Sequence, residues 1–366
     1  MTLELTAVIS LGAWICLLTA RGGFWRISAP VKPSRVGIGK SVCVIIPARN
    51  EESVVGEAIT SLRPWHVILV DDHSSDRTAA VAVEAGAEVI QAGPLPPGWS
   101  GKLWAVSEGL RHAQSVVPDY LLFTDADIVH APGNVAELVA RAEARGLDLV
   151  SLMVKLRCRS LAETLLIPAF VFFFFMLCPP AWVARRDRKT AAAAGGCILI
   201  RPSALERIGG IASIRGEIID DCALARAVKR TGGGIWLGVT EETHSIRDYT
   251  TFAEIRNMIS RTAFAQLHHS ALLLLGTVLG MAIIYLAPPL LLFTRNPLAA
   301  FFGLAAWILM TVAYAPALRF YGRSVAWAPL LPLIALFYIS ATIDSAIAYW
   351  TGRGGLWKDR VQDANQ

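Results

Sequence analysis

Charged side chains are scarce in this sequence. Aspartate, glutamate, lysine and arginine make up 17% of its 366 residues, whereas 54% of the residues are hydrophobic. Soluble globular proteins carry about 25% charged residues. The composition therefore argues against a wholly soluble chain, and the mean hydropathy of +0.48 predicts that part of it lies in a membrane.

Other signals are also missing. The basic residues are scattered and the formal net charge is only +5, which argues against a nucleic-acid partner and favours contact with a membrane surface. The six cysteines form no C-x-x-C pair and have no histidines at metal-binding spacing. We therefore expect reduced, structural cysteines.

A long apolar run stands near the N-terminus. Residues 3–20 hold one charge, Glu4, and are long enough for a short transmembrane helix. The positive charges come after this run and not before it, which is the reverse of a secretory signal peptide. We expect an uncleaved anchor over residues 1–22, and the positive-inside rule then places the next domain in the cytoplasm. The basic residues that follow are Arg21, Arg26, Lys32, Arg35 and Lys40.

Three more apolar stretches lie near the C-terminus, at 271–293, 297–318 and 325–350. Together they predict three transmembrane helices over residues 271–350. The preceding segment, 251–270, is typical of an amphipathic membrane boundary, and a polar tail, 351–366, ends the chain. Four crossings that begin outside would return the tail to the outside, whereas its basic residues favour the cytoplasm. Its side therefore stays open.

A further apolar segment, 163–184, interrupts the polar middle of the chain. It contains the run FVFFFF together with Pro168, Pro179 and Pro180. The prolines favour an interfacial or re-entrant helix, with a full crossing as the alternative. The aromatic run either faces an amphiphile at the bilayer surface or packs against other helices.

Residues 41–250 have the pattern of a soluble domain. SVCVIIPARNEE is a β-branched run that ends at a turn, SVVGEAITSL has helical spacing, and HVILVDDHSSDRTAAVAVEAG repeats this order. AEVIQAG and YLLFTDADIV predict further strands on either side of the helix KLWAVSEGLRHAQ. Strands that alternate with helices predict an α/β domain with a mostly parallel sheet.

Acidic residues follow three of these strands. They are Glu51 and Glu52, Asp71 and Asp72, and Asp125 and Asp127. Ligands of open α/β sheets bind at the carboxyl ends of the strands, and carboxylate oxygens suit Mg²⁺ or Mn²⁺. Although aspartate is also common at turns, three acidic strand ends favour a site. Asp125 and Asp127 are the candidate ligands of a metal that neutralises a diphosphate.

Five motifs occur in a recognisable order: VIIPARNEE, ILVDDHSSDRT, GKLWAVSEGL, TDADI and GEIIDDCALARAVKRTGG. In this order the chain resembles the family 2 glycosyltransferases with the GT-A fold, a Rossmann-like domain. With its apolar ends it is most similar to the hopanoid-biosynthesis-associated membrane members. The resemblance implies a nucleotide-sugar donor, a lipid acceptor such as a hopanoid or related isoprenoid alcohol, and a multi-pass location in the cytoplasmic membrane of a bacterium.

The resemblance also implies roles for single residues on the donor side. Those that match are Pro47, Ala48 and Glu51 in the first nucleotide-binding loop, Asp72 at the nucleobase, and Lys102 beside the diphosphate, with Asp125 also on this side. Asp72 alone would also suit a helix cap, and Lys102 alone would suit a solvated surface. Ser107 replaces the asparagine usual in the family, which leaves the contacts of that loop open.

The motif at 214–233 carries the predicted reaction. Asp220 and Asp221 precede a run with helical spacing, so they lie near a helix N-terminus, where carboxylates are also favoured electrostatically. In the resembled family the second acid is the general base, which is Asp221 here, and the usual glutamate before it is Asp220. The resemblance predicts an inverting single displacement in which Asp221 takes the proton of the acceptor hydroxyl.

The acceptor side is predicted from two more matches. Gly195 and Gly196 resemble the small-residue loop that borders the acceptor, although a tight turn alone also favours glycine. Arg261 matches the arginine of a Q-x-x-R-W motif whose glutamine and tryptophan are missing here. A processive synthase normally needs the complete motif, so a single transfer is predicted. His244 is either structural or close to the metal or phosphate.

Two other functions stay open from the sequence. A polyprenyl-phosphate glycosyltransferase would use a phosphate oxygen as nucleophile and would not need Asp221 as a base. A membrane transport or scaffolding protein would keep the fold without turnover, and the presence of Asp125, Asp127 and Asp221 argues against it.

Overall fold

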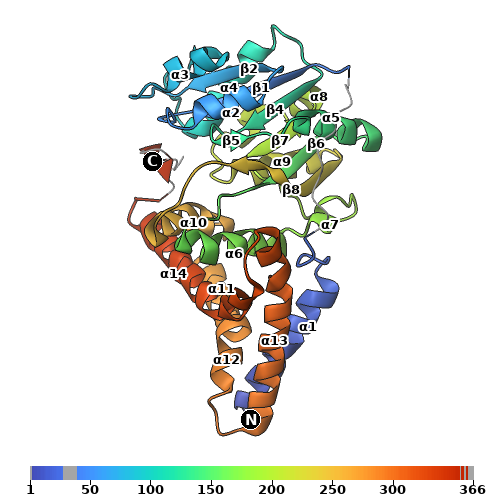
Figure 1. Ribbon diagram of the computed structural model, residues 1–366, viewed down its shortest axis with the longest axis vertical. Coiled ribbons are helices and arrows are strands. Elements are labelled where there is room, and N and C mark those ends of the chain that lie inside the picture. Colours follow the sequence, from blue (N-terminus) through green and yellow to red (C-terminus); the bar gives the residue numbers. More distant parts are fainter. Residues whose placement is uncertain (1, 28–38, 355, 358–359, 362–366) are drawn as a thin grey trace. The chain divides into compact units, whose positions relative to one another are not determined.

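The computed structural model describes residues 2–27, 39–354, 356–357 and 360–361 (Figure 1). The chain forms two compact units. The helical unit consists of Met1–Ile27, Cys158–Ala181 and Tyr249–Gly354, and the α/β unit of Ser28–Arg157, Trp182–Asp248 and Gly355–Gln366. Two residues of the predicted basic flank, Lys32 and Arg35, lie outside the described residues, as does half of the predicted polar tail.

The α/β unit contains an eight-stranded sheet with the order β3-β2-β1-β4-β7-β6-β8-β5. The strands are β1 (Val42–Ala48), β2 (His66–Asp71), β3 (Glu88–Gln91), β4 (Tyr120–Thr124), β5 (Ile128–Val129), β6 (Leu149–Lys155), β7 (Cys197–Ile200) and β8 (Ile235–Ser245). β1 to β4 pair in parallel, as do β6 and β8, whereas β7 and β5 are antiparallel to their neighbours. The predicted α/β class with a mostly parallel sheet is confirmed.

Helices connect these strands, and those over 55–61, 78–85, 101–113 and 220–230 lie where the sequence predicted helical segments. They are α2 (Val55–Ser61), α3 (Thr78–Ala85), α4 (Gly101–Ala113), α5 (Asn134–Arg145), α8 (Pro202–Arg207), η1 (Ile211–Ile214) and α9 (Asp220–Arg230). The Ser100 side chain caps α4 by accepting the Leu103 N–H, which fixes the first turn of this helix. A Cβ atom on Gly109 would lie 2.6 Å from Ile45, so a glycine is needed for α4 to pack closely on β1.

The helical unit contains α1 (Thr2–Ala20), α6 (Leu161–Leu177), α10 (Phe252–Gln266), α11 (Ala271–Met281), η2 (Ala282–Leu286), α12 (Ala287–Leu291), α13 (Pro297–Phe320), η3 (Val325–Leu330) and α14 (Leu331–Trp350). The short helix α7 (Pro180–Val183) follows α6. Among the described residues, five helical stretches are long and apolar enough to cross a membrane: Thr2–Ala20, Leu161–Val183, Ala271–Leu291, Pro297–Phe320 and Val325–Trp350. These stretches indicate membrane association.

The apolar segment predicted within the α/β domain belongs to the helical unit up to Ala181. In Figure 1, α6 runs across the direction of α1 and α13. The rings of Phe172 and Phe173 are 3% and 8% exposed and contact tyrosine rings of α13, η2 and α14. Helix packing therefore accounts for much of the aromatic run, because its largest side chains fill the interior of the unit.

Candidate active site

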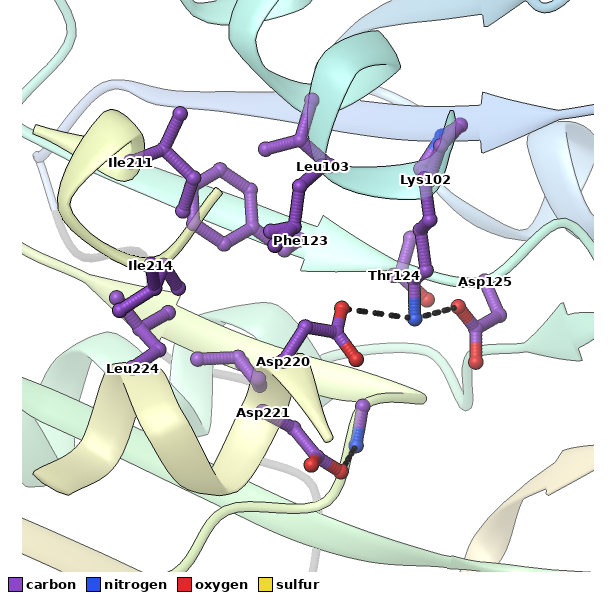
Figure 2. Close-up of a pocket in the computed structure, with 14 residues that line it drawn as sticks. Lys102, Leu103, Phe123, Thr124, Asp125, Ile211, Ile214, Asp220, Asp221 and Leu224 are labelled. Carbon is purple, nitrogen blue, oxygen red and sulfur yellow. Dashed lines mark hydrogen bonds and ion pairs between the residues drawn. The ribbon is translucent and has the colours of Figure 1, made fainter. Parts of the chain in front are cut away.

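A pocket of about 370 Å³ opens where β1 and β4 end (Figure 2). Figure 2 shows its apolar side chains, among them Leu103, Phe123 and Ile211, gathered on one side and its charged side chains on the other. It is lined by Pro47, Lys102, Leu103, Val106, Phe123, Thr124, Asp125, Gly195, Ile198, Ile211, Ile214, Asp220, Asp221 and Leu224. The structure thus brings six of the predicted site residues to one cavity.

Lys102 is the centre of the charged side. Its ammonium nitrogen lies 3.0 Å from Oδ1 of Asp125 and 3.4 Å from Oδ2 of Asp220. Burial acts to lower the pKa of Lys102, but these two carboxylates outweigh burial and raise it, so the side chain stays charged. The predicted alternative of a solvated surface lysine is wrong, because the side chain is only 20% exposed and is held between two carboxylates.

Asp221 lies behind this cluster in the first turn of α9. Its Oδ2 accepts the Gly195 N–H at 2.9 Å and its Oδ1 accepts the Cys222 N–H at 2.6 Å. Burial and then the charge of Asp220 raise the pKa of Asp221 to about 6, while Lys102 acts in the opposite direction. Such a carboxylate is mostly ionised near neutral pH and still accepts a proton readily.

Gly195 and Gly196 pass close to these groups. A Cβ atom on Gly195 would lie 3.4 Å from both the Asp221 carboxylate and the Lys102 ammonium. The Gly196 carbonyl accepts the Thr124 hydroxyl at 2.8 Å. A side chain at position 195 would therefore crowd the charged end of the pocket, as is expected of a loop beside a bound substrate.

A second charged cluster joins Glu51, Asp127 and Arg247. One guanidinium nitrogen of Arg247 lies 2.6 and 2.7 Å from the two carboxylate oxygens of Glu51, and its Nε lies 3.5 Å from Oδ2 of Asp127. The Ser245 hydroxyl also donates to Asp127. Burial raises the pKa of Asp127, and the charge of Arg247 opposes this. None of these side chains lines the pocket described above.

Sequence reasoning missed Arg247 and Ser245. The available signal was the polar run HSIRD, in which the sequence pointed only to His244. β5 pairs with β8 so that Ile128 lies opposite Ser245, and this pairing brings the run to Asp127. The His244 ring is next to the carbonyl of Glu242, a local contact that favours the structural alternative.

Asp125 and Asp127 are the predicted ligands of Mg²⁺ or Mn²⁺. The Asp125 side chain is 37% exposed and lines the pocket, whereas Asp127 is nearly buried. Among the described residues, no group of three or more histidine, cysteine, aspartate or glutamate side chains is arranged for a metal. Mg²⁺ is often held by one or two carboxylates together with substrate phosphates. Asp125, which lines the pocket, fits that mode of binding, whereas Asp127 contacts Arg247 and Ser245, so its role as a ligand stays a prediction.

Two predicted nucleotide contacts are buried beside the sheet. Asp72 is fully buried, its N–H donates to the Ala48 carbonyl at 2.8 Å, and its Oδ2 lies 3.8 Å from Nη1 of Arg49. Neither Asp72 nor Ala48 lines the pocket, so their roles stay predictions. Arg261 lies on α10 of the helical unit, where it is exposed.

Comparison with known proteins agrees with this geometry. Residues 43–209 match the profile described as Glycosyl transferase family 2. This match assigns residues 43–209 to glycosyl transferase family 2. This span includes β1 to β7 and most pocket residues, whereas the general-base motif predicted at Asp220 and Asp221 follows it.

Two curated relatives share a limited part of the chain. The 4,4'-diaponeurosporenoate glycosyltransferase of Staphylococcus haemolyticus (strain JCSC1435) is 39% identical over 118 residues, which cover 30% of this chain and 31% of that protein. Its counterpart from Staphylococcus aureus (strain bovine RF122 / ET3-1) is 39% identical over 103 residues and 27% of each chain. The match thus spans about a third of the length of these relatives or less. Neither name points to the hopanoid-associated subgroup.

One solved structure resembles nearly the whole chain. The mannosyltransferase PcManGT from Pyrobaculum calidifontis, in complex with GDP-Man and Mn²⁺, superposes with a TM-score of 0.59 over 94% of this chain and 98% of that one. The sequence identity is 17%, so the likeness establishes the shared fold only.

Proposed function

We propose that this protein is a membrane-associated glycosyltransferase that moves one sugar from a nucleotide-diphosphate sugar to a hydroxyl of a lipid. The observation that carries the proposal is the half-buried Asp221 carboxylate, with its pKa of about 6, in the same pocket as the cluster of Lys102, Asp125 and Asp220. One end of the cavity thus offers a base for the acceptor and a cation for the leaving group.

The proposed reaction is a single displacement. The acceptor oxygen forms a bond to the anomeric carbon as the bond from this carbon to the diphosphate oxygen breaks, and the electron pair leaves with the nucleoside diphosphate. Asp221 accepts the hydroxyl proton. Because the incoming and leaving oxygens lie on opposite faces of the sugar, the configuration inverts.

Lys102 is proposed to stabilise the departing diphosphate. Its ammonium is already oriented by Asp125 and Asp220, so little reorganisation is needed as negative charge develops on the leaving oxygen. Asp125 and Asp127 would hold a divalent metal, which supplies additional positive charge to the diphosphate when it is bound. The mannosyltransferase complex contains GDP-Man and Mn²⁺, which supports a divalent metal with the donor here.

An amphiphilic acceptor fits the pocket. Leu224, Ile211 and Ile214 form an apolar wall opposite the charged groups, so a hydroxyl can approach Asp221 while apolar atoms of the acceptor contact the wall. The long apolar helices supply the membrane association that such an acceptor requires. The curated relatives act on a carotenoid acid according to their name, which supports an isoprenoid lipid here. A hopanoid alcohol is the narrower form of this proposal, which those relatives do not support.

The same relatives favour a second candidate, transfer to a carboxylate of an isoprenoid acid. A carboxylate nucleophile is already ionised at neutral pH, so this reaction does not need Asp221 as a base. A polyprenyl phosphate would behave in the same way. The effect of replacing Asp221 on transfer therefore distinguishes alcohol acceptors from acid and phosphate acceptors.

The experiment uses membranes that contain the full chain, a panel of labelled nucleotide sugars, and isoprenoid alcohols or acids as acceptors. Asp221→Asn is expected to lower transfer to an alcohol at least a hundredfold, because removal of a general base typically costs 10²–10⁴-fold. The matched control, Glu217→Gln, removes an exposed carboxylate shortly before α9 and should retain activity. Chelation of divalent metal should abolish transfer, and added Mn²⁺ or Mg²⁺ should restore it.

Each outcome separates the candidates. If Asp221→Asn loses transfer to alcohols but keeps transfer to acids, Asp221 acts as a base that only hydroxyl acceptors need. Full activity of Asp221→Asn with an alcohol would refute the proposed mechanism. Activity that survives both chelation and Asp125→Ala would refute the metal role.

A further inference from the structure

The loop between α7 and β7 carries a dense positive charge. Residues 184–190, ARRDRKT, are exposed from 184 to 189. The Arg185 guanidinium pairs with Asp187 at 2.6 Å. The basic residues are Arg185, Arg186, Arg188 and Lys189, and with the one aspartate they give the loop a net charge of +3.

The base of this basic loop is held closed by Lys229 in the last turn of α9. The Lys229 ammonium donates to the carbonyls of Trp182, Val183 and Thr190 at 3.3, 2.7 and 2.6 Å. These contacts join the two ends of the loop, and the Arg188 guanidinium lies 5.3 Å from the centre of the Trp182 ring. The loop therefore presents its charges from a fixed base.

The chain connects this loop directly to an apolar helical stretch. Leu161–Val183 is apolar and long enough to cross a membrane, and the first basic residue of the loop, Arg185, follows two residues later. Basic clusters next to the membrane end of an apolar helix attract anionic lipids. In the sequence, the positive charges therefore begin directly after the apolar stretch ends.

The same loop leads into the acceptor side of the pocket. Beyond Lys189 the chain runs along α9 and contacts it at three points. The Thr190 carbonyl accepts from Lys229, and the Ala193 carbonyl lies 3.7 Å from the Cys222 thiol. The Gly195 N–H donates to the Asp221 carboxylate in the first turn of the helix. One helix therefore fixes both the basic loop and the residue that borders the proposed base.

We propose that the basic loop is a binding site for the phosphate headgroups of anionic phospholipids at the membrane surface. The partner is recognised by the net negative charge of its headgroup and by its presence at an interface. The inference goes beyond the proposed sugar transfer, and binding of phospholipid can be measured without any turnover.

The test uses the full chain purified in a neutral detergent and titrated with phosphatidylglycerol or phosphatidylcholine, with bound lipid counted by native mass spectrometry. One basic side chain near an anionic surface strengthens binding about fivefold. Loss of all four positive charges should therefore weaken phosphatidylglycerol binding at least tenfold and leave phosphatidylcholine binding unchanged. The loop variant is R185Q/R186Q/R188Q/K189Q. The wild-type preference for phosphatidylglycerol should also decrease as salt is added.

A matched control removes four exposed arginines from other parts of the α/β unit: R63Q/R77Q/R111Q/R145Q. It should bind phosphatidylglycerol like the wild type, and thermal unfolding should show that both variants are folded. Equal losses in the two variants, or no loss in the loop variant, would overturn the proposal. Binding of inorganic phosphate at the loop as tight as that of phosphatidylglycerol would also overturn the assignment to a lipid.

Discussion

Replacement of Asp220 by asparagine should move the acid limb of the pH–rate profile to lower pH. Burial is the first cause of the raised pKa of Asp221, and the charge of Asp220 is the second. The substitution keeps the shape and the burial of the site but removes this neighbouring negative charge. We therefore expect the pKa of Asp221 to decrease towards the ordinary aspartate value, with part of the rise remaining because of burial.

The size of the effect follows from the pKa of about 6. At pH 5 a group with this pKa is about one-tenth ionised, whereas a group with a pKa lower by about one is about half ionised. We compare the activity at pH 5, divided by the activity at pH 7.5, between the two proteins. If ionised Asp221 is the base, this ratio should be about fivefold higher in Asp220→Asn than in the wild type.

The assay is kcat/KM for an alcohol acceptor between pH 4.5 and 8, because this ratio reports the groups of the free enzyme. Glu217→Gln is the matched control: it removes an exposed carboxylate, whose charge is screened by solvent. An acid limb that stays in place in Asp220→Asn, or that moves equally in Glu217→Gln, would refute the assignment of the limb to Asp221.

Three further substitutions test individual contacts. Arg247→Met takes the guanidinium away from the nearly buried Glu51 and Asp127. Unfolding should become easier by about 2 kcal/mol at pH 7, and this loss of stability should shrink as the pH falls, because the raised pKa of Asp127 favours its neutral form. Lys229→Met removes the donor to three carbonyls and should cost about 1–2 kcal/mol of thermal stability. Gly195→Ala adds a methyl group 3.4 Å from both the proposed base and the ammonium of the pocket, and should lower kcat/KM at least tenfold with little change in stability.

The controls for these variants are conservative changes. Arg247→Lys keeps a positive charge and should recover part of the lost stability. Gly280→Ala adds a methyl group that meets no other atom within 4 Å, so it should leave the activity unchanged. If Arg247→Met is as stable as the wild type, the ion pairs described here do not contribute to folding. If Gly195→Ala keeps full activity, the glycine does not border the reacting groups.

The order of elements was predictable from local patterns. Strand residues of β1 and β4 are continuously apolar because these strands are buried on both faces, and the long apolar helices are defined by their composition. The carboxyl ends of β1, β2 and β4 lie at one edge because the strands are parallel neighbours. This geometry is why the acidic residues that follow these strands, among them Asp125, could be predicted to lie at one edge of the sheet.

Only the tertiary structure decided which charged groups meet. Arg247 and Glu51 are 196 residues apart, and Asp127 and Ser245 are 118 apart, so their contact depends on the pairing of β5 with β8. Likewise, the raised pKa of Asp221 arises mainly from burial, which spacing in the sequence does not encode. The sequence determined the helices and strands because the pattern of apolar and polar residues repeats over a few neighbouring positions. The chemistry of the site depends instead on distances between segments that only the folded chain brings together.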